Sequence, residues 1–124
     1  MQKSPVIFSE KLAANGKIIA IAELNAPKSL NALSLPMFIL LTNQLKLWQK
    51  NDDIAVVVLQ GAGEKAFCAG GDVVSLYHHL KGENFPISDE EIKSSKAIDF
   101  FKSEYQLDQL VHGYKKPILV WANG

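Results

Sequence analysis

The chain has 124 residues, which is enough for one small domain or for part of a larger one. Its 13 basic and 13 acidic side chains balance, so nothing in the composition points to nucleic acid or to an anionic membrane. No apolar run approaches the ~20 residues needed to cross a bilayer, and the N-terminus turns polar too early for a secretory signal. One cysteine excludes an internal disulfide framework and suits a reducing compartment, so we expect a cytoplasmic protein. Three histidines without a CxxC or HExxH motif give no reason to expect a metal site.

The chain begins with a predicted β-hairpin. Val6–Phe8 and Lys17–Leu24 have the composition of strands. Asn15-Gly16 lies between them and is a turn signal.

The first predicted helix follows a polar loop, Asn25–Asn31. Ser34 is a good N-cap for this helix, and Pro36 lies in its first turn. We expect the helix to end near Lys50–Asp53. Its apolar residues fall at helical spacing on one face: Met37, Leu40, Leu41, Leu45 and Trp48.

The middle of the chain predicts a strand and a short helix. Ile54–Gln60 is apolar and rich in β-branched residues, which is typical of a strand buried on both faces. After Asp72, four apolar residues trace one face of a short helix: Val73, Leu76, Tyr77 and Leu80. Lys81–Ser88 then predicts a mobile surface loop, and Ser88 is a candidate cap for a further helix.

The last third predicts a longer helix and a final strand. The helix runs to about His112–Gly113, and Pro117–Ala122 has the composition of another buried strand. The resulting order, β-β-α-β-α-α-β, defines an α/β fold. Because buried parallel strands normally lie between covering helices, and this one leads directly to Asn123-Gly124, we expect the N-terminal portion of a longer protein. The apolar residues that mark the helix are Phe100, Phe101, Tyr105, Leu107 and Leu110.

The most informative stretch is Gly61–Asp72, which reads GAGEKAFCAGGD. Its four glycines let the backbone approach a ligand closely, and a helix that begins near Asp72 aims its first N–H groups at the loop. This arrangement suits an anion, or an oxygen that becomes one.

Two alternatives remain for this stretch. A dinucleotide fingerprint would need a third glycine where Ala66 stands, an earlier helix start and an acidic residue after a following strand. A purely structural glycine turn would not need two glycine clusters.

The stretch Lys65–Asp72 resembles the acyl-CoA motif of the crotonase (enoyl-CoA hydratase/isomerase) superfamily. Leu24–Leu33, Ile54–Gly63 and Lys116–Gly124 resemble further segments of that family in the same order and spacing. The resemblance covers nearly the whole chain. It implies a crotonase-like ββα spiral fold, of which residues 1–124 are the incomplete N-terminal part. It also implies an acyl-CoA substrate, with coenzyme A as part of the substrate and no other cofactor.

By this resemblance, the Gly71 N–H is one of two backbone donors that polarise a thioester carbonyl. Loss of one such donor costs ~10²–10³ in rate in other enzymes. Gly70 and Gly71 let the thioester lie against the main chain, where a side chain would obstruct it. Asp72 belongs to the same CoA-binding stretch, and its simpler role is to cap the helix and fix the loop.

The resemblance also implies contacts with the nucleotide of CoA. The Ala69 carbonyl is expected to accept a hydrogen bond from the adenine amino group. Lys28, Ser29 and Leu30 are expected to border the same nucleotide. A solvated loop lysine is the alternative for Lys28.

Other side chains with chemical potential receive simpler interpretations. Cys68 has no basic partner adjacent in sequence, and the family uses no cysteine there, so we interpret it as a packing residue. His78 and His79 point about 100° apart on a helix and are expected at the surface. His112, near a predicted helix C-terminus, is assigned no chemistry.

The pattern FFKSEY at Phe100–Tyr105 resembles the 3-hydroxyisobutyryl-CoA hydrolase branch of the superfamily, as do Phe67–Asp72 and Tyr105–Asp108. In that branch the glutamate that matches Glu104 lines the acyl pocket; a solvated helix residue is the alternative. The branch implies hydrolysis of 3-hydroxyisobutyryl-CoA in valine catabolism. An enoyl-CoA hydratase or isomerase is the alternative enzyme, and a non-catalytic CoA-binding fragment is the alternative of another class.

Part of the implied site is expected outside this chain. The family places the second oxyanion N–H a few residues beyond Gly124, and the acid/base carboxylates, a Glu and an Asp, further on. Loss of a proton-transfer group costs ~10²–10⁴ in rate. We therefore expect the 124-residue chain alone to be close to inactive and poorly folded, with apolar sheet surface exposed. The parent protein is expected to be a homo-oligomer.

Overall fold

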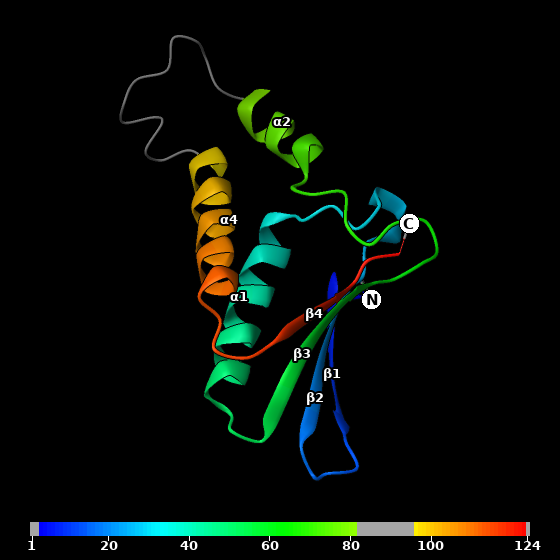
Figure 1. Ribbon diagram of the computed structural model, residues 1–124. Helices are drawn as coiled ribbons and strands as arrows, with labels where there is room; N and C mark the ends of the chain where they lie inside the picture. Colours follow the sequence, from blue (N-terminus) through cyan, green and yellow to red (C-terminus); the bar gives the residue numbers. More distant parts are fainter. Residues whose placement is uncertain (1–2, 82–95, 124) are drawn as a thin grey trace.

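A computed structural model describes residues 3–81 and 96–123 (Figure 1). The described chain forms one four-stranded sheet, in the order β1-β2-β3-β4, with helices packed on one face. The predicted loop and cap between Lys81 and Ser88 lie, apart from Lys81 itself, outside the described residues. In chain order the elements are β1 (Val6–Leu12), β2 (Ile18–Leu24), η1 (Pro27–Ser29), α1 (Leu35–Lys50), β3 (Ile54–Gly61), α2 (Val73–Lys81), α4 (Lys96–His112) and β4 (Ile118–Trp121).

The predicted hairpin is confirmed. Strands β1 and β2 pair antiparallel from Val6↔Leu24 to Leu12↔Ile18. The turn between them is closed by the Ala13 N–H donating to the Lys17 carbonyl, and Gly16 alone adopts a positive φ, +80°, as in a three-residue hairpin loop. Strand β1 extends further than predicted, because its backbone pairs with β2 as far as Leu12. The sequence did not indicate this second half of the strand, because it is largely polar and lies exposed.

Strands β2, β3 and β4 run parallel, as expected for an α/β fold. Their register places Ile21 beside Val58, and Val58 beside Leu119. Helix α1 connects β2 to β3, and α2 and α4 lie between β3 and β4 in the chain. No helix of the described residues combines the length and apolar character needed to cross a membrane.

Helix α1 packs its apolar side against the sheet, and α4 lies beside it (Figure 1). Its start after Ser34, with Pro36 in the first turn, and its end at Lys50 agree with the sequence prediction. The buried face is wider than predicted, because Phe38 and Thr42 are also buried. Leu40, which was predicted on this face, is only half-buried. Phe38 meets Phe100 of α4 edge to face, with ring centroids 5.2 Å apart. The spacing of apolar residues within α1 cannot show that a second helix, α4, packs against the side of α1.

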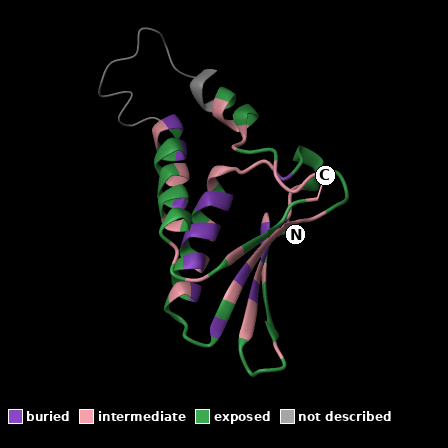
Figure 2. Ribbon diagram, viewed as in Figure 1, coloured by how far each residue is buried: buried purple, intermediate pink, exposed green. Residues whose placement is uncertain are grey.

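The prediction that β3 and β4 are buried on both faces is wrong (Figure 2). Val57 faces the helices and is fully buried, whereas Val58 is half-buried and Trp121 is 67% exposed. Within the described residues only one face of the sheet carries helices, and β4 is its last strand. We call the other side, formed by Ile21, Val58, Leu119 and Trp121, the outer sheet face. The exposed outer sheet face agrees with the expectation that this chain leaves apolar sheet surface uncovered.

Helix α2 also differs from its prediction. Val73 and Tyr77, expected on its buried face, are 72% and 58% exposed. The reason is that α2 stands away from the sheet and contacts mainly α4 (Figure 1). Helix α4 itself ends at His112, as predicted.

Candidate functional site

Two loops meet where β2 and β3 end. Residues 25–34 follow β2 and residues 61–72 follow β3; because these strands are parallel neighbours, both loops leave the same edge of the sheet. The Ala62 N–H donates to the Leu24 carbonyl at 2.8 Å, and the Ala69 N–H donates to the Leu30 carbonyl at 3.0 Å. We call this pairing of residues 25–34 with residues 61–72 the loop crossing.

Gly71 occupies a short parallel bridge with Leu33 inside the loop crossing. The Leu33 N–H donates to the Gly70 carbonyl at 2.7 Å, and the Asp72 N–H donates to the Leu33 carbonyl at 2.8 Å. In such a bridge the central residue makes neither bond, so the Gly71 N–H points to the opposite side. Among the described residues it donates to no protein acceptor. The backbone reaches this arrangement through Gly70, whose φ of +91° suits glycine.

Asp72 caps α2, as its simpler interpretation predicts. The Ser75 N–H donates to Asp72 Oδ1 at 3.1 Å, and the Ser75 hydroxyl donates to Oδ2 at 2.6 Å. The hydroxyl bond is the main cause that lowers the pKa of Asp72. Because both carboxylate oxygens hold the first turn, the cap also fixes the chain directly after Gly71.

The fold brings Glu104 to Gly71 from a distant part of the chain. A Cβ placed on Gly71 would lie 3.4 Å from Phe100 Cζ and 3.8 Å from Glu104 Oε1. Glu104 is half-buried and Phe100 is buried. The space that a Cβ on Gly71 would enter is therefore bordered by the Phe100 ring and the Glu104 carboxylate, both from α4.

The predicted nucleotide-binding residues lie on the exposed side of the loop crossing. Lys28 and Ser29 belong to η1, and Leu30 follows it in the left-handed region; all three are exposed. Ala69, also exposed, joins them through its bond to Leu30.

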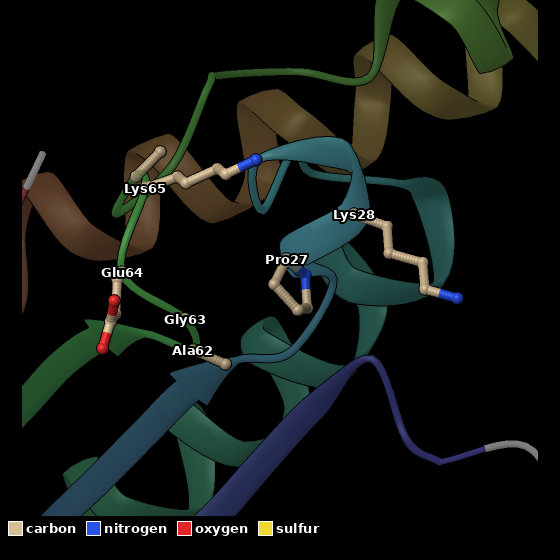
Figure 3. A pocket seen from close by; sticks show the side chains of 7 residues that line it. Pro27, Lys28, Ala62, Gly63, Glu64 and Lys65 are labelled. Atoms are coloured by element: carbon tan, nitrogen blue, oxygen red, sulfur yellow. The ribbon is translucent and has the colours of Figure 1, made fainter.

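We call residues 61–72 the glycine loop. A hollow of about 400 Å³ lies between η1 and this loop (Figure 3). Figure 3 shows Lys65 extending toward η1 and Glu64 directed away from it. Lys65 received no role from the sequence, although its position in the motif and its charge were visible. The hollow is lined by Pro27, Lys28, Ala62, Gly63, Glu64, Lys65 and Ala66.

Asn31 is the residue at the centre of the loop crossing, and the sequence analysis gave it no role. Its side chain is fully buried. Its Oδ1 accepts a hydrogen bond from the Ala26 N–H at 2.9 Å, and its Nδ2 donates to the carbonyls of Ala62 and Ala66, both at 3.0 Å. An asparagine in a loop is a weak signal, because most such residues cap turns in solvent.

The remaining candidates behave as packing or surface residues. Cys68 is half-buried, packs against the core with Phe67, and accepts a hydrogen bond at Sγ from the Gly70 N–H at 3.3 Å. Its interpretation as a packing residue is confirmed. His78 and His112 are exposed, and the side chain of His79 lies outside the described part of the structure. Across residues 3–81 and 96–123, no three His, Cys, Asp or Glu side chains cluster in a way that could hold a metal ion.

The chain belongs to the enoyl-CoA hydratase/isomerase family, whose family model matches residues 19–124. It is 40% identical over 121 residues to the mitochondrial 3-hydroxyisobutyryl-CoA hydrolase of Danio rerio, covering 98% of this chain and 28% of that protein. The human protein of the same name is 33% identical over 124 residues, covering the whole chain and 30% of its own length. The small ribosomal subunit protein mS47 of Neurospora crassa is 38% identical over 103 residues, covering 82% of this chain and 19% of that protein. The chain therefore spans less than a third of these relatives.

Solved structures agree with the family. A carnitinyl-CoA dehydratase from Mycobacterium thermoresistibile superposes with a TM-score of 0.75 at 31% identity, covering 95% of this chain and 30% of that one. An enoyl-CoA hydratase from Rhodobacter sphaeroides superposes with a TM-score of 0.76 at 26% identity, covering 98% and 32%. The predicted fold class is confirmed: the chain is part of a crotonase-like α/β fold.

Proposed function

We propose that this chain provides the thioester-binding half of an acyl-CoA hydrolase site, and that the longer protein acts on 3-hydroxyisobutyryl-CoA in valine catabolism. The observation that carries the proposal is the Gly71 N–H. It is held by the Leu33 bridge and the Asp72 cap, and it donates to no acceptor among the described residues. The names and identities of the hydrolase relatives support the choice of reaction.

In this proposal the thioester carbonyl oxygen accepts a hydrogen bond from Gly71. The donor is fixed before the reaction and lies at the start of α2, so it stabilises the negative charge that develops on that oxygen without rearranging. The second donor and the acid/base carboxylates would come from parts of the longer protein outside this chain. Gly71 alone would then account for ~10²–10³ of the rate.

Glu104 would select the acyl group. Its carboxylate lies beside Gly71, where the acyl chain of a bound thioester would pass. A carboxylate can only accept hydrogen bonds when ionised, so it favours an acyl group that carries a hydroxyl. This is the chemical reason to prefer 3-hydroxyisobutyryl-CoA over an enoyl-CoA substrate.

The exposed side of the loop crossing would hold the nucleotide of CoA. Lys28 and Lys65 border the hollow there and provide positive charge for phosphate groups. The Ala69 carbonyl would accept a hydrogen bond from the adenine amino group, with Ser29 and Leu30 beside the nucleotide.

The test is thiol release from 3-hydroxyisobutyryl-CoA by a protein that contains this segment and has the length of its relatives. Gly71→Pro removes the N–H without breaking a described internal hydrogen bond and should lower kcat by ~10²–10³. Gly71→Ala keeps the N–H but places a methyl 3.4 Å from Phe100 and 3.8 Å from Glu104 Oε1, in the proposed acyl space, so it measures the obstruction alone and should lower kcat less than Gly71→Pro. Unchanged turnover in Gly71→Pro would remove Gly71 from the mechanism. Hydration of an enoyl-CoA without thiol release would favour the hydratase alternative.

A non-catalytic role is the second candidate, and the similarity to the ribosomal protein mS47 favours it. A protein of this kind could bind CoA without turning it over. Isothermal titration with CoA, run beside the thiol assay on the longer protein, separates the two. Binding without turnover would support the non-catalytic role.

We further propose a homo-oligomeric parent in a reducing compartment. The sequence suggests the cytoplasm, whereas the names of the hydrolase relatives point to mitochondria. Fractionation of cells with detection of the untagged protein decides between them.

A further inference from the structure

Asn31 is an unusual buried residue in this fold. It is fully buried within a loop, and the other buried polar side chain of the described core, Thr42, lies in a regular helix. Its backbone has φ +55°, and Leu30 before it has φ +54°. Such values are uncommon for residues other than glycine, and asparagine tolerates them better than most. The chain therefore turns sharply at this point and directs an amide inward.

The Asn31 amide closes a small ring in the glycine loop. Both of its N–H groups are used, because they bond to the carbonyls of Ala62 and Ala66. These two carbonyls bracket the residues that border the hollow opposite η1. The amide oxygen holds the other loop through the Ala26 N–H. One side chain thus fixes the shape of both loops.

The same residue lies at the centre of the backbone pairing that sets Gly71. Leu30 and Leu33, on either side of it, make the bonds to Ala69, Gly70 and Asp72. There is no spare room around the amide, since a Cβ on Gly61 would lie 2.8 Å from Asn31 Nδ2. The pairing cannot slide along the glycine loop while the amide stays in place.

We propose that Asn31 is the positioning residue of the acyl-CoA site: its amide holds the glycine loop in the one register in which the Gly71 N–H faces the ligand. The part of this inference that concerns acyl-CoA rests on the proposed function. Asn31 itself acts through the loops and need not touch the substrate.

The substitution Asn31→Asp tests this with almost no change in shape. It replaces the NH2 group, with its two N–H donors, by one oxygen that faces the carbonyls of Ala62 and Ala66, so the loop loses both bonds and gains repulsion. Burial beside two carbonyl oxygens raises the pKa of the new carboxyl, so at low pH it takes up a proton, regains one donor and partly relieves the defect. The matched control is Asn15→Asp in the β1–β2 turn, an exposed residue whose Oδ1 accepts a hydrogen bond from the Lys17 N–H at 3.0 Å and can still do so as a carboxylate.

The readouts, on a protein that contains this segment and has the length of its relatives, are amide hydrogen exchange and CoA binding by titration calorimetry at pH 7.5 and 5.5. In Asn31→Asp the Ala69 and Asp72 amides should exchange faster, while those of β3 and α1 stay protected. CoA affinity should fall by ~10–100-fold at pH 7.5 and recover in part at pH 5.5. Asn15→Asp should change neither readout.

Three outcomes overturn the inference. Unchanged exchange at Ala69 and Asp72 in Asn31→Asp would show that the amide does not hold the register. Faster exchange spread evenly over β3 and α1 would show that Asn31 supports the whole fold and not the site. CoA affinity that stays unchanged at pH 7.5 in Asn31→Asp would show that the amide does not position the CoA site. If the longer protein without substitutions does not bind CoA, the proposed function fails, and the exchange data alone decide whether Asn31 sets the register.

Discussion

The loop crossing and the outer sheet face are two surfaces of one small fold, and they are built in opposite ways. In the loop crossing a fully buried polar side chain has partners for both its donors and its acceptor, and backbone bonds join residues far apart in sequence. On the outer sheet face, apolar side chains such as Trp121 are exposed to solvent (Figure 2). The candidate site residues of the loop crossing are therefore held by hydrogen bonds within this chain, whereas among the described residues helices cover the sheet on one face only.

The largest effect should come from crowding the loop crossing. A Cβ on Gly61 would lie 2.5 Å from the Phe67 carbonyl oxygen, so Gly61→Ala must displace backbone. We expect a loss of about 3 kcal/mol in the free energy of unfolding, measured by urea denaturation. Gly113→Ala is the control, because its Cβ would have only an ordinary contact at 3.7 Å. Equal stability of the two variants would mean that the loops are not closely packed.

A smaller effect should come from removing the cap that joins the loop crossing to α2. Asp72→Ala should cost about 1 kcal/mol, seen in urea denaturation followed by circular dichroism. Because the pKa of Asp72 is lowered in the folded state, the stabilisation is present above its ordinary value of 3.8 and is lost as pH falls through the lower folded-state pKa. The difference between the native chain and Asp72→Ala should therefore vanish only in strong acid. A difference that disappears near neutral pH would contradict this role.

The smallest effect on stability should come from the outer sheet face. Trp121→Lys changes an exposed side chain on the last strand and should alter the free energy of unfolding by less than about 0.5 kcal/mol. It should nevertheless reduce self-association in sedimentation equilibrium, because a charge on an exposed apolar face opposes burial of that face against a second copy of the chain. Leu12→Lys, at the 77% exposed end of β1, is the control and should leave association unchanged. Identical self-association of Trp121→Lys and the unaltered chain would show that the outer sheet face does not mediate self-association.

The sequence was sufficient for most of the fold because local signals and tertiary structure agree there. Asn15-Gly16 predicts the hairpin turn, and Ser34 with Pro36 predicts the start of α1. The errors lie in burial. An apolar run such as Pro117–Ala122 shows that a strand is suited to a core, but not whether anything covers it.

The site was predictable only where chemistry shows in the motif. The glycine loop indicated a helix start near Asp72, and the resemblance gave the roles of Gly71 and Glu104; the proximity of Gly71 and Glu104 depends on how α4 packs. Asn31 was missed because its role arises from burial and from partners more than 30 positions away in sequence. The spacing of residues in a sequence does not show which distant residues become hydrogen-bond partners in the fold.

The most direct test is the NMR signal of the Gly71 amide in the 124-residue chain during titration with 3-hydroxyisobutyryl-CoA, beside free CoA as the matched ligand without a thioester carbonyl. We predict that the Gly71 amide proton moves downfield with the thioester and not with free CoA, since only the thioester offers the oxygen. Signals of residues 28–30 should move with both ligands. A Gly71 amide that stays in place while the thioester binds would contradict the central claim that this N–H holds the carbonyl.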